Sequence, residues 1–346
     1  MLSDCLLTGN PFASDLTLYC DQYSATSYDR GVELTFRNVE HIGKAPPNLQ
    51  WMLQRKIPFR GVRLLHIAEI YVDKKGSLYS PKIIQKLKKP VDYFDVNCCF
   101  CSQPGDAVFG HWIFQTLPRA WFYSQKLQGK KFKCLFHKRA KSMFRIFEHF
   151  FKTIDGFDGA IFLDDDPVGI RDLYFCDKPN HGNLLYNSNY LQFRKSLFEN
   201  IKLDTNIHSP AKIYFSRSNW SRSYRFLTNR KKVENLFRTR GYEIVSPEEY
   251  GLVDMMNMLQ STKILAGERG SALHLSAFSE SVETSIVLSY NDDSSPMWPA
   301  QAGLGTACNQ NTVFIFGEGR ATGNTTNDFE YTISLEDVDS VIDYCV

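Results

Sequence analysis

Short apolar runs alternate with segments of helical apolar spacing through much of the C-terminal half of the chain. The apolar runs predict strands at residues 212–216, 242–245, 263–267 and 285–290. The helical spacing predicts helices at residues 229–240, from Ser246 to 259, and at 275–278. The second of these is expected to open with a capping box at Ser246, with Pro247 as its first helical residue. This alternation favours a parallel sheet with helices on both faces.

Two of the predicted loops follow strands and carry groups that suit an anion. The first holds Arg217, Arg222 and Arg225 among four serines, and the second places Gly270-Ser271 at the start of a helix. Ligands bind beyond the carboxyl ends of such strands. Helix N-termini and paired guanidinium hydrogen bonds both suit phosphate. These loops therefore predict an anion site, although Gly270 is also explained if it only lets strand and helix pack closely.

A second informative stretch, residues 110–123, is largely apolar but carries a repeated polar position. His111, Gln115 and Arg119 recur every four residues, which would place them on one stripe of a helix. Pro118 is expected to bend or end the first part of that helix. Buried polar groups need partners, so the stripe either pairs internally or faces a cleft. Histidine titrates near neutral pH, which makes His111 a candidate proton acceptor if the stripe faces a cleft.

Three further clusters allow both a functional and a structural interpretation. Asp164 and Asp166 follow an apolar run, so they could hold a hard divalent cation or simply form an exposed turn. Cys98, Cys99 and Cys101 lack a second ligand pair at zinc spacing. The basic run at residues 126–145 is typical of solvated surface, and its alternative is a patch for an anionic membrane or a phosphorylated glycolipid.

Composition adds limits to these local predictions. A length of 346 residues suggests two domains, with a junction expected near residue 205. The formal charge of +2 does not suggest nucleic-acid binding. Nine scattered cysteines, an odd number, fit reduced thiols in a cytoplasmic enzyme. The sequence contains no uninterrupted apolar stretch of the length that a membrane-spanning helix needs.

Two motifs in the expected order resemble glycosyltransferase family 61. The first is Gly110-His111-Trp112 with Leu117-Pro118-Arg119, and the second is Gly267-Glu268-Arg269-Gly270-Ser271-Ala272-Leu273-His274. The resemblance covers about half of the chain, roughly residues 106–278. Eukaryotic members usually carry His-Gly-Ala where this chain has Arg269-Gly270-Ser271. The bacterial branch, which includes polysaccharide and lipopolysaccharide enzymes, is therefore the closer one.

The resemblance implies an inverting glycosyltransferase built from two Rossmann-like domains that face a cleft, the GT-B arrangement. The expected domains are 1–205 on the acceptor side and 206–320 for the nucleotide-sugar, with the tail 321–346 crossing back to the first domain. The expected donor is a nucleotide-sugar, with UDP as its nucleotide, and the acceptor is a glycan or glycolipid in surface polysaccharide biosynthesis. No metal is expected, and the enzyme is placed in the cytoplasm, with peripheral contact to the inner face of an anionic membrane.

The resemblance implies the reaction, and the residues themselves suggest a division of roles. At the donor, we expect Arg217, Arg269, Gly270 and Ser271 at the diphosphate, Ser246 beside the nucleobase, Glu248 at the ribose and His274 nearby. His111 is the first candidate for the base, followed by Asp106 and Glu268, with Gln115 and Arg119 on the acceptor side. Two alternatives stay open: a non-catalytic nucleotide- or glycan-binding module, and a metal-dependent GT-A transferase built on Asp164 and Asp166.

Overall fold

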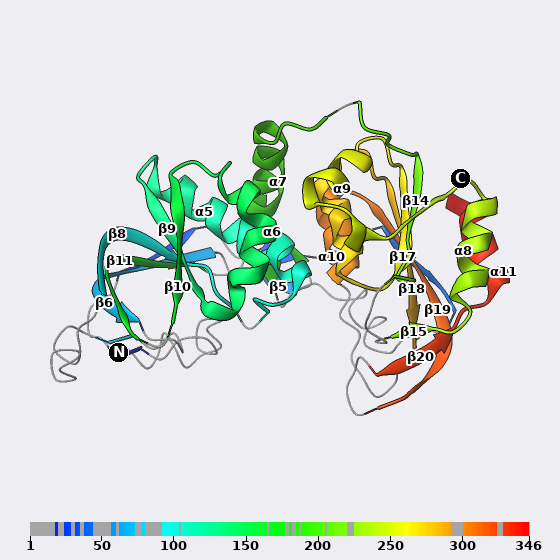
Figure 1. Cartoon of the computed structure of the whole chain (residues 1–346), viewed down its shortest axis with the longest axis horizontal. Coiled ribbons are helices and arrows are strands. Elements are labelled where there is room, and N and C mark those ends of the chain that lie inside the picture. The colour runs from blue at the N-terminus through cyan, green and yellow to red at the C-terminus, as the bar shows by residue number, and fades with distance from the viewer. Residues whose placement is uncertain are drawn as a thin grey trace. The chain divides into compact units, whose positions relative to one another are not determined.

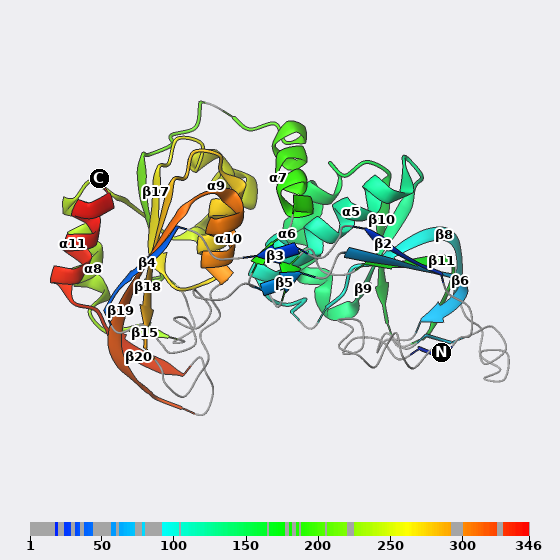
Figure 2. The ribbon, with the colours of Figure 1, turned by 180° about the vertical axis from the view of Figure 1, so that it is seen from behind.

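The chain forms two compact units in a computed structural model (Figure 1, Figure 2). The model describes residues 18–19, 24–28, 32–34, 38–43, 57–59, 62–72, 78–79, 92–103, 105–164, 166–176, 180–181, 185–186, 188–204, 206–219, 225–291, 300–323 and 328–345. Unit 1 takes the described residues within 1–32, 58–180 and 188–201, and unit 2 takes those within 33–57, 181–187 and 202–346. The change of unit after residue 201 lies close to the junction expected near 205. The expected first domain was continuous, however, whereas an early segment of the chain belongs to unit 2.

Unit 2 is a doubly wound sheet. Its parallel strands are β14 (Lys212–Phe215), β16 (Glu243–Val245), β17 (Ile264–Glu268), β18 (Thr284–Tyr290) and β19 (Asn311–Ala321). They pair in the order β16-β14-β17-β18-β19, which is 2-1-3-4-5 in chain order. This is one of the two common doubly wound orders, and it reverses between β14 and β17. The parallel sheet predicted from the alternating pattern is thus confirmed.

Helices cover both faces of this sheet. They are α8 (Arg230–Thr239), α9 (Leu252–Met258), the 3-10 helix η4 (Ser271–Phe278), α10 (Ala300–Cys308) and α11 (Leu335–Cys345). Figure 1 shows α8 and α11 on one face, with α9 and α10 on the other. Val233 and Phe237 of α8 share a buried core with Val338 and Ile342 of α11.

The C-terminal helix packs within unit 2. Arg240, at the end of α8, lies 2.6 Å from Asp339 and 2.8 Å from Asp343, both on α11. The tail was expected to cross back to the first domain, whereas α11 is held against α8 by this buried core and these ion pairs. The apolar stripe of α11 explains this contact. Such a stripe can pack against any apolar surface, so the sequence pattern alone does not say which surface it covers.

Two boundaries in unit 2 differ from expectation. The helix predicted to open at Ser246 is instead a 3-10 turn, Pro247–Glu249, and Ser246 makes no side-chain cap. Tyr250 and Gly251 are extended, so α9 begins at Leu252. The glycine, threonine and asparagine content of residues 317–327 predicts irregular structure. Residues 317–321 instead continue β19, because they pair with the antiparallel strand β20 (Phe329–Thr332). At the sheet's edges, β4 (Val39–Ile42) pairs with β19 and β15 (Phe226–Leu227) with β20.

Unit 1 has a mixed sheet that curls strongly (Figure 1). Its parallel strands are β8 (Asp92–Phe100), β9 (Phe132–His137), β10 (Phe157–Leu163) and β11 (Val168–Cys176). The long strand β6 (Val62–Val72) pairs antiparallel with β11, and short strands continue the sheet at β1 (Leu18–Tyr19), β2 (Ser24–Tyr28) and β7 (Leu78–Tyr79). Both units are therefore α/β, but only unit 2 has the flavodoxin-like strand order.

The remaining elements of unit 1 include α5 (Leu117–Leu127), α6 (Lys141–Phe151) and α7 (Ser188–Asn200). Aromatic residues join these helices to the sheet. Trp112 stacks on Phe136 of β9 at 5.4 Å and on Phe147 of α6 at 5.5 Å. Trp112 is fully buried, so this cluster fixes the start of the helix that carries the first sequence motif. Outside the two large sheets, two pairs of short strands form, β3 (Val32–Leu34) with β5 (Ile57–Phe59), and β12 (Asn180–His181) with β13 (Leu185–Tyr186).

Candidate functional site

The two anion-suited loops of unit 2 lie side by side at the point where the strand order reverses. Phe215, the last residue of β14, is paired with Gly267 of β17. The next residues are Ser216-Arg217 on one strand and Glu268-Arg269 on the other. In doubly wound sheets this switch point is where ligands bind. Topology thus brings together Arg217 and Arg269, which the sequence had placed in separate loops.

A buried ion pair lies next to the ends of β14 and β17. Arg230, the first residue of α8, donates to Glu268 through Nε at 2.6 Å and through Nη2 at 3.1 Å. Glu268 is only 3% exposed, and charge-assisted pairs with this paired geometry are among the strongest hydrogen bonds. Both carboxylate oxygens of Glu268 are therefore engaged, which does not favour its predicted role as the base.

Around this ion pair, unit 2 gathers guanidinium groups of like charge. Burial, and then the charge of Arg225, lower the pKa of Arg217. Burial, and then the charge of Arg269, lower the pKa of Arg225, whose buried Nε has no hydrogen-bond partner among the described residues. The Arg269 guanidinium lies over the Tyr290 ring, 5.0 Å from its centroid. We call Arg217, Arg225 and Arg269 the arginine cluster; Arg222 of the same loop lies outside the described residues.

The glycine after β17 is not explained by packing. A Cβ on Gly270 would meet only the Glu268 carbonyl oxygen, at 3.7 Å, and its φ of 179° is ordinary extended backbone. Gly267 is different, because a Cβ there would lie 2.9 Å from the Phe215 carbonyl oxygen. Close strand packing therefore requires Gly267, whereas the surroundings of Gly270 leave room. Ser271 then begins η4 with no side-chain cap.

The other predicted donor residues lie near these loops or on η4. The Ser246 hydroxyl accepts from Asn219 Nδ2 at 3.2 Å, which ties the end of β16 to the loop that carries Arg217. Glu248 is exposed in the following 3-10 turn. The His274 ring nitrogen Nδ1 lies 2.9 Å from Gln301 Oε1, so His274 links η4 to α10.

In unit 1, the first motif forms a helix of changing type. Phe109–His111 is α-helical, Trp112–Thr116 is a π turn, and α5 begins at Leu117. Pro118 lacks an N–H, so the change of hydrogen-bond register occurs where a regular helix would lose a bond. The predicted bend at Pro118 therefore takes the form of a π turn, a feature frequent at functional sites.

The π turn divides the polar stripe. His111 Nδ1 lies 2.7 Å from Oε1 of Gln115, which is fully buried. Arg119, 4% exposed, instead donates through Nη1 to the Ser102 carbonyl at 3.1 Å and the Cys101 carbonyl at 3.4 Å. The three residues therefore do not point one way, because the extra residue of the π turn rotates Arg119 away from the direction of His111.

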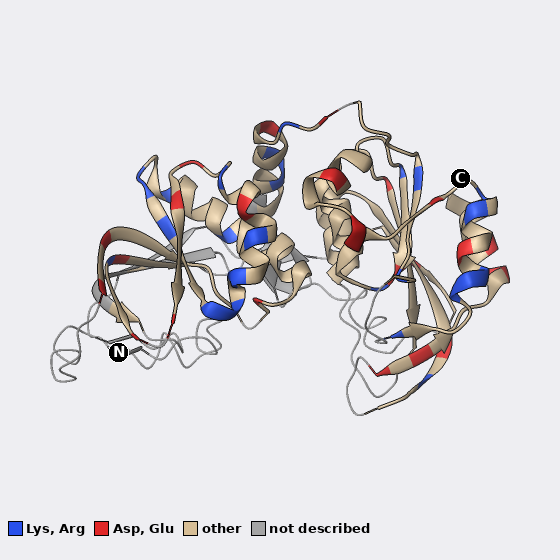
Figure 3. Cartoon of the chain, viewed as in Figure 1, with Lys and Arg blue, Asp and Glu red and all other residues tan. Residues whose placement is uncertain are grey.

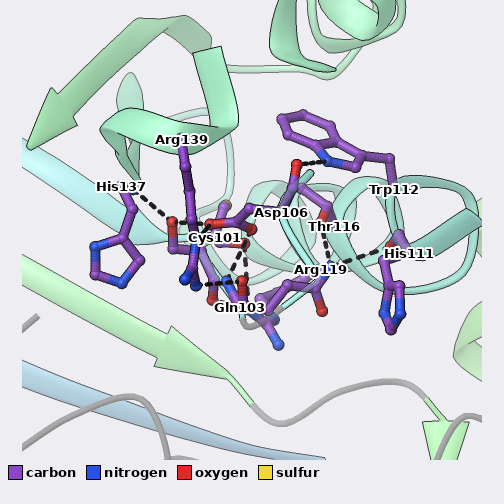
Figure 4. Close-up of polar contacts among 10 residues, drawn as sticks. Cys101, Gln103, Asp106, His111, Trp112, Thr116, Arg119, His137 and Arg139 are labelled. Carbon is purple, nitrogen blue, oxygen red and sulfur yellow. Dashed lines mark hydrogen bonds and ion pairs between the residues drawn. The ribbon is translucent and has the colours of Figure 1, made fainter. Parts of the chain in front are cut away.

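Asp106 is the centre of a buried network beside this helix (Figure 4). Its carboxylate accepts from Ser102 Oγ at 2.7 Å and from the Gln103 amide at 2.9 Å, and Arg139 Nε lies 3.7 Å away. Trp112 Nε1 donates to its backbone carbonyl at 2.9 Å. Burial raises the pKa of the Asp106 carboxyl to about 6, although the two hydrogen bonds and the arginine charge lower it. The carboxyl is fully buried and already engaged, which does not favour it as the base.

Because the pKa of Asp106 is raised in the folded chain, we expect its protonation to make the folding stability depend on pH. In the unfolded chain Asp106 releases its proton near pH 4, whereas in the folded chain it holds the proton up to about pH 6. The folding stability that protonated Asp106 contributes is therefore complete below pH 4 and is lost as pH rises through about 6. The full difference is about 3 kcal/mol, from about 1.4 kcal/mol per pKa unit. Asp106→Asn should remove this pH dependence of the unfolding free energy, measured by urea titration between pH 4 and pH 8. Asp155→Asn, at an exposed position, should keep the wild-type dependence; equal slopes in all three proteins would contradict the assignment.

The alternative clusters are dispersed. Asp164 pairs with Lys138 at 2.6 Å with both side chains exposed, Asp166 is exposed, and Asp165 lies outside the described residues. Among the residues with described placement, no three His, Cys, Asp or Glu side chains gather to hold a metal. Cys98, Cys99 and Cys101 are buried. Figure 3 shows Lys and Arg on several elements of unit 1.

Sequence reasoning placed Arg225 in a loop predicted to bind an anion but did not include it among the named donor residues. It missed Arg230. A signal for Arg230 existed, because a cation in the first turn of a helix opposes the helix dipole and so calls for a compensating group. Its partner Glu268 is 38 residues away, and no local pattern links them.

Unit 2 belongs to the class of doubly wound α/β folds, and its arginine cluster lies at the switch point of the sheet. The sequence profile of glycosyltransferase 61 matches residues 109–287, just over half of the chain, and spans both motifs. The chain therefore belongs to glycosyltransferase family 61, a family of sugar-transferring enzymes. No curated protein matches it significantly. None of the described helices combines the length and apolar character needed to cross a bilayer.

Proposed function

We propose that the protein is an inverting glycosyltransferase of GT-B type that uses a nucleotide-sugar donor. The observation that carries this proposal is the arginine cluster at the switch point of unit 2. Arg217, Arg225 and Arg269, with the amides at Gly270 and Ser271, bind the donor diphosphate. Its negative charge grows as the sugar–phosphate bond breaks, and fixed positive groups aimed at developing charge are a large catalytic contribution.

The charges around Glu268 support a diphosphate as the ligand. Buried charges of like sign are unfavourable unless a counter-charge accompanies them. Glu268 carries a single negative charge and is paired with Arg230, so it offsets the charges of Arg217 and Arg225 only in part. A nucleoside diphosphate supplies the missing negative charge without a metal ion, and UDP is the nucleotide we propose. Ser246 and Glu248 would contact the nucleobase and ribose, and His274 would support η4.

Unit 1 supplies the acceptor side in this proposal. His111 is the base, and Gln115 and Arg119 shape its surroundings. The resemblance to bacterial polysaccharide enzymes supports a glycan or glycolipid acceptor in surface polysaccharide biosynthesis. The odd number of scattered cysteines supports a reducing compartment, the cytoplasm, where the acceptor would be met at the inner face of the membrane.

Calorimetric titration with UDP, GDP and CMP tests the donor site. We expect UDP to bind to the wild type, and Arg217→Gln, Arg225→Gln and Arg269→Gln each to weaken that binding at least 10-fold, about 1.4 kcal/mol. Arg238→Gln is the matched control, because Arg238 is exposed on α8 and bonds only to nearby Asn235 among its described contacts. Equal affinities for all five proteins would contradict a diphosphate site at the arginine cluster.

The two rival functions are separated by donor hydrolysis with UDP-, GDP- and CMP-sugars, with and without EDTA. A metal-independent transferase should hydrolyse its donor slowly in both conditions. Loss of hydrolysis in EDTA, repeated by Asp166→Asn, would favour the GT-A alternative. Nucleotide binding with no hydrolysis of any donor, and no transfer to a glycan acceptor, would favour the non-catalytic module.

A further inference from the structure

His111 is held on two sides by residues close to it in sequence. Its Nδ1 lies 2.7 Å from Gln115 Oε1, one turn along the helix. Its ring lies against the backbone of Gly105, where an added Cβ would overlap the ring atoms. The ring also packs against Phe114, with 5.2 Å between the ring centroids. The imidazole therefore has a defined place and a defined partner for one of its two nitrogens.

The identity of that partner sets the tautomer. An amide oxygen only accepts hydrogen bonds, so the proton of a neutral His111 lies on Nδ1. The lone pair then lies on Nε2, which becomes the nitrogen that can take a proton. Gln115 is fully buried on the π turn, so its side chain is held by its surroundings. The carboxylate of Asp106 and the guanidinium of Arg119 do not replace it, because they bond to Ser102, Gln103 and the Cys101 carbonyl.

We propose that Gln115 is a positioning residue that holds His111 as the Nδ1–H tautomer and so makes Nε2 the proton-accepting atom. This inference rests on the proposed role of His111 as the base. In the transfer step, the acceptor hydroxyl oxygen bonds to the anomeric carbon and its proton moves to Nε2. The bond from the anomeric carbon to the diphosphate oxygen breaks, and its electron pair leaves with the nucleoside diphosphate. Gln115, expected from sequence on the acceptor side, acts through His111 instead.

Nitrogen-15 NMR of histidine-labelled protein reads the tautomer without substrate. The chain has eight histidines, and the signals that disappear in His111→Ala assign this one. We expect Nδ1–H in the wild type, a shift of the population toward Nε2–H in Gln115→Leu, and Nδ1–H again in Gln115→Glu, whose carboxylate also accepts. Gln125→Leu is the matched control, because Gln125 is exposed on α5, and it should leave the His111 signals unchanged. An Nε2–H tautomer in the wild type would overturn the inference, whatever the activity.

The pH profile of sugar transfer gives the second measurement. A carboxylate beside the imidazole favours its protonated form, so Gln115→Glu should raise the pKa of His111 and move the acid limb of kcat/KM about one pH unit higher. Gln115→Leu should lower kcat at least 10-fold with a smaller change in KM. If Gln115 had a purely structural role, Gln115→Leu and Gln115→Glu would both lose activity and the acid limb of kcat/KM would not move. That result would also overturn the inference. An Nδ1–H signal combined with full activity of His111→Ala would instead show that the proposed base is wrong.

Discussion

Replacing His111 with alanine is expected to lower kcat for sugar transfer at least 100-fold. A positioned general base contributes about 10²–10⁴-fold, and alanine leaves no group in its place to take the proton of the acceptor hydroxyl. Donor binding should change little, because the residues proposed to hold the diphosphate lie in unit 2. Initial rates of transfer and calorimetry with UDP measure the two quantities on the same protein.

The control for this experiment is His149→Ala. His149 is an exposed histidine on α6 in the same unit, so its loss removes a similar side chain without touching the first motif. We expect wild-type kcat from this variant. A His111→Ala protein with near-normal turnover and normal UDP affinity would remove His111 as the base and leave the donor site standing.

Local sequence patterns predicted the strands and helices of unit 2 well, because each of these elements has its own apolar run or helical apolar spacing. The strand at 285–290 and the helix at 229–240 were recovered almost to the residue, since apolar runs and helical periodicity report directly on burial. The capping box at Ser246 failed because the signal is also satisfied by a single 3-10 turn. The backbone at Tyr250 and Gly251 is extended, so the 3-10 turn ends there and does not continue as an α-helix.

Local patterns could single out the residues of the candidate site but not their contacts. Two loops with arginine and glycine indicated an anion, and strand order, which no local pattern encodes, placed those loops next to each other. The polar stripe of the first motif was predicted on regular α-helix geometry. One π turn before Pro118 was enough to separate Arg119 from His111 and to turn Arg119 toward the end of β8. Long-range pairs such as Arg230–Glu268 became visible only in the fold.

The same ion pair leads to the second large effect, a loss of stability. Glu268→Gln keeps the shape of the side chain but removes its charge, which leaves Arg230 and the arginine cluster without their buried counter-charge. Removing one partner of a buried pair costs about 3–5 kcal/mol. We therefore expect a decrease of that size in the unfolding free energy, measured in urea so that added salt does not screen the charges.

Glu283→Gln is the matched control for burial. Glu283 pairs with Lys263 at the same distance, 2.6 Å, but both side chains are more than half exposed, whereas those of Arg230 and Glu268 are 15% and 0% exposed. Exposed pairs contribute at most about 1 kcal/mol. UDP should recover part of the stability lost in Glu268→Gln, because a bound diphosphate restores negative charge beside the arginines and binding stabilises the folded state. If Glu268 were the base instead, its glutamine variant would lose turnover while unfolding at the wild-type urea concentration.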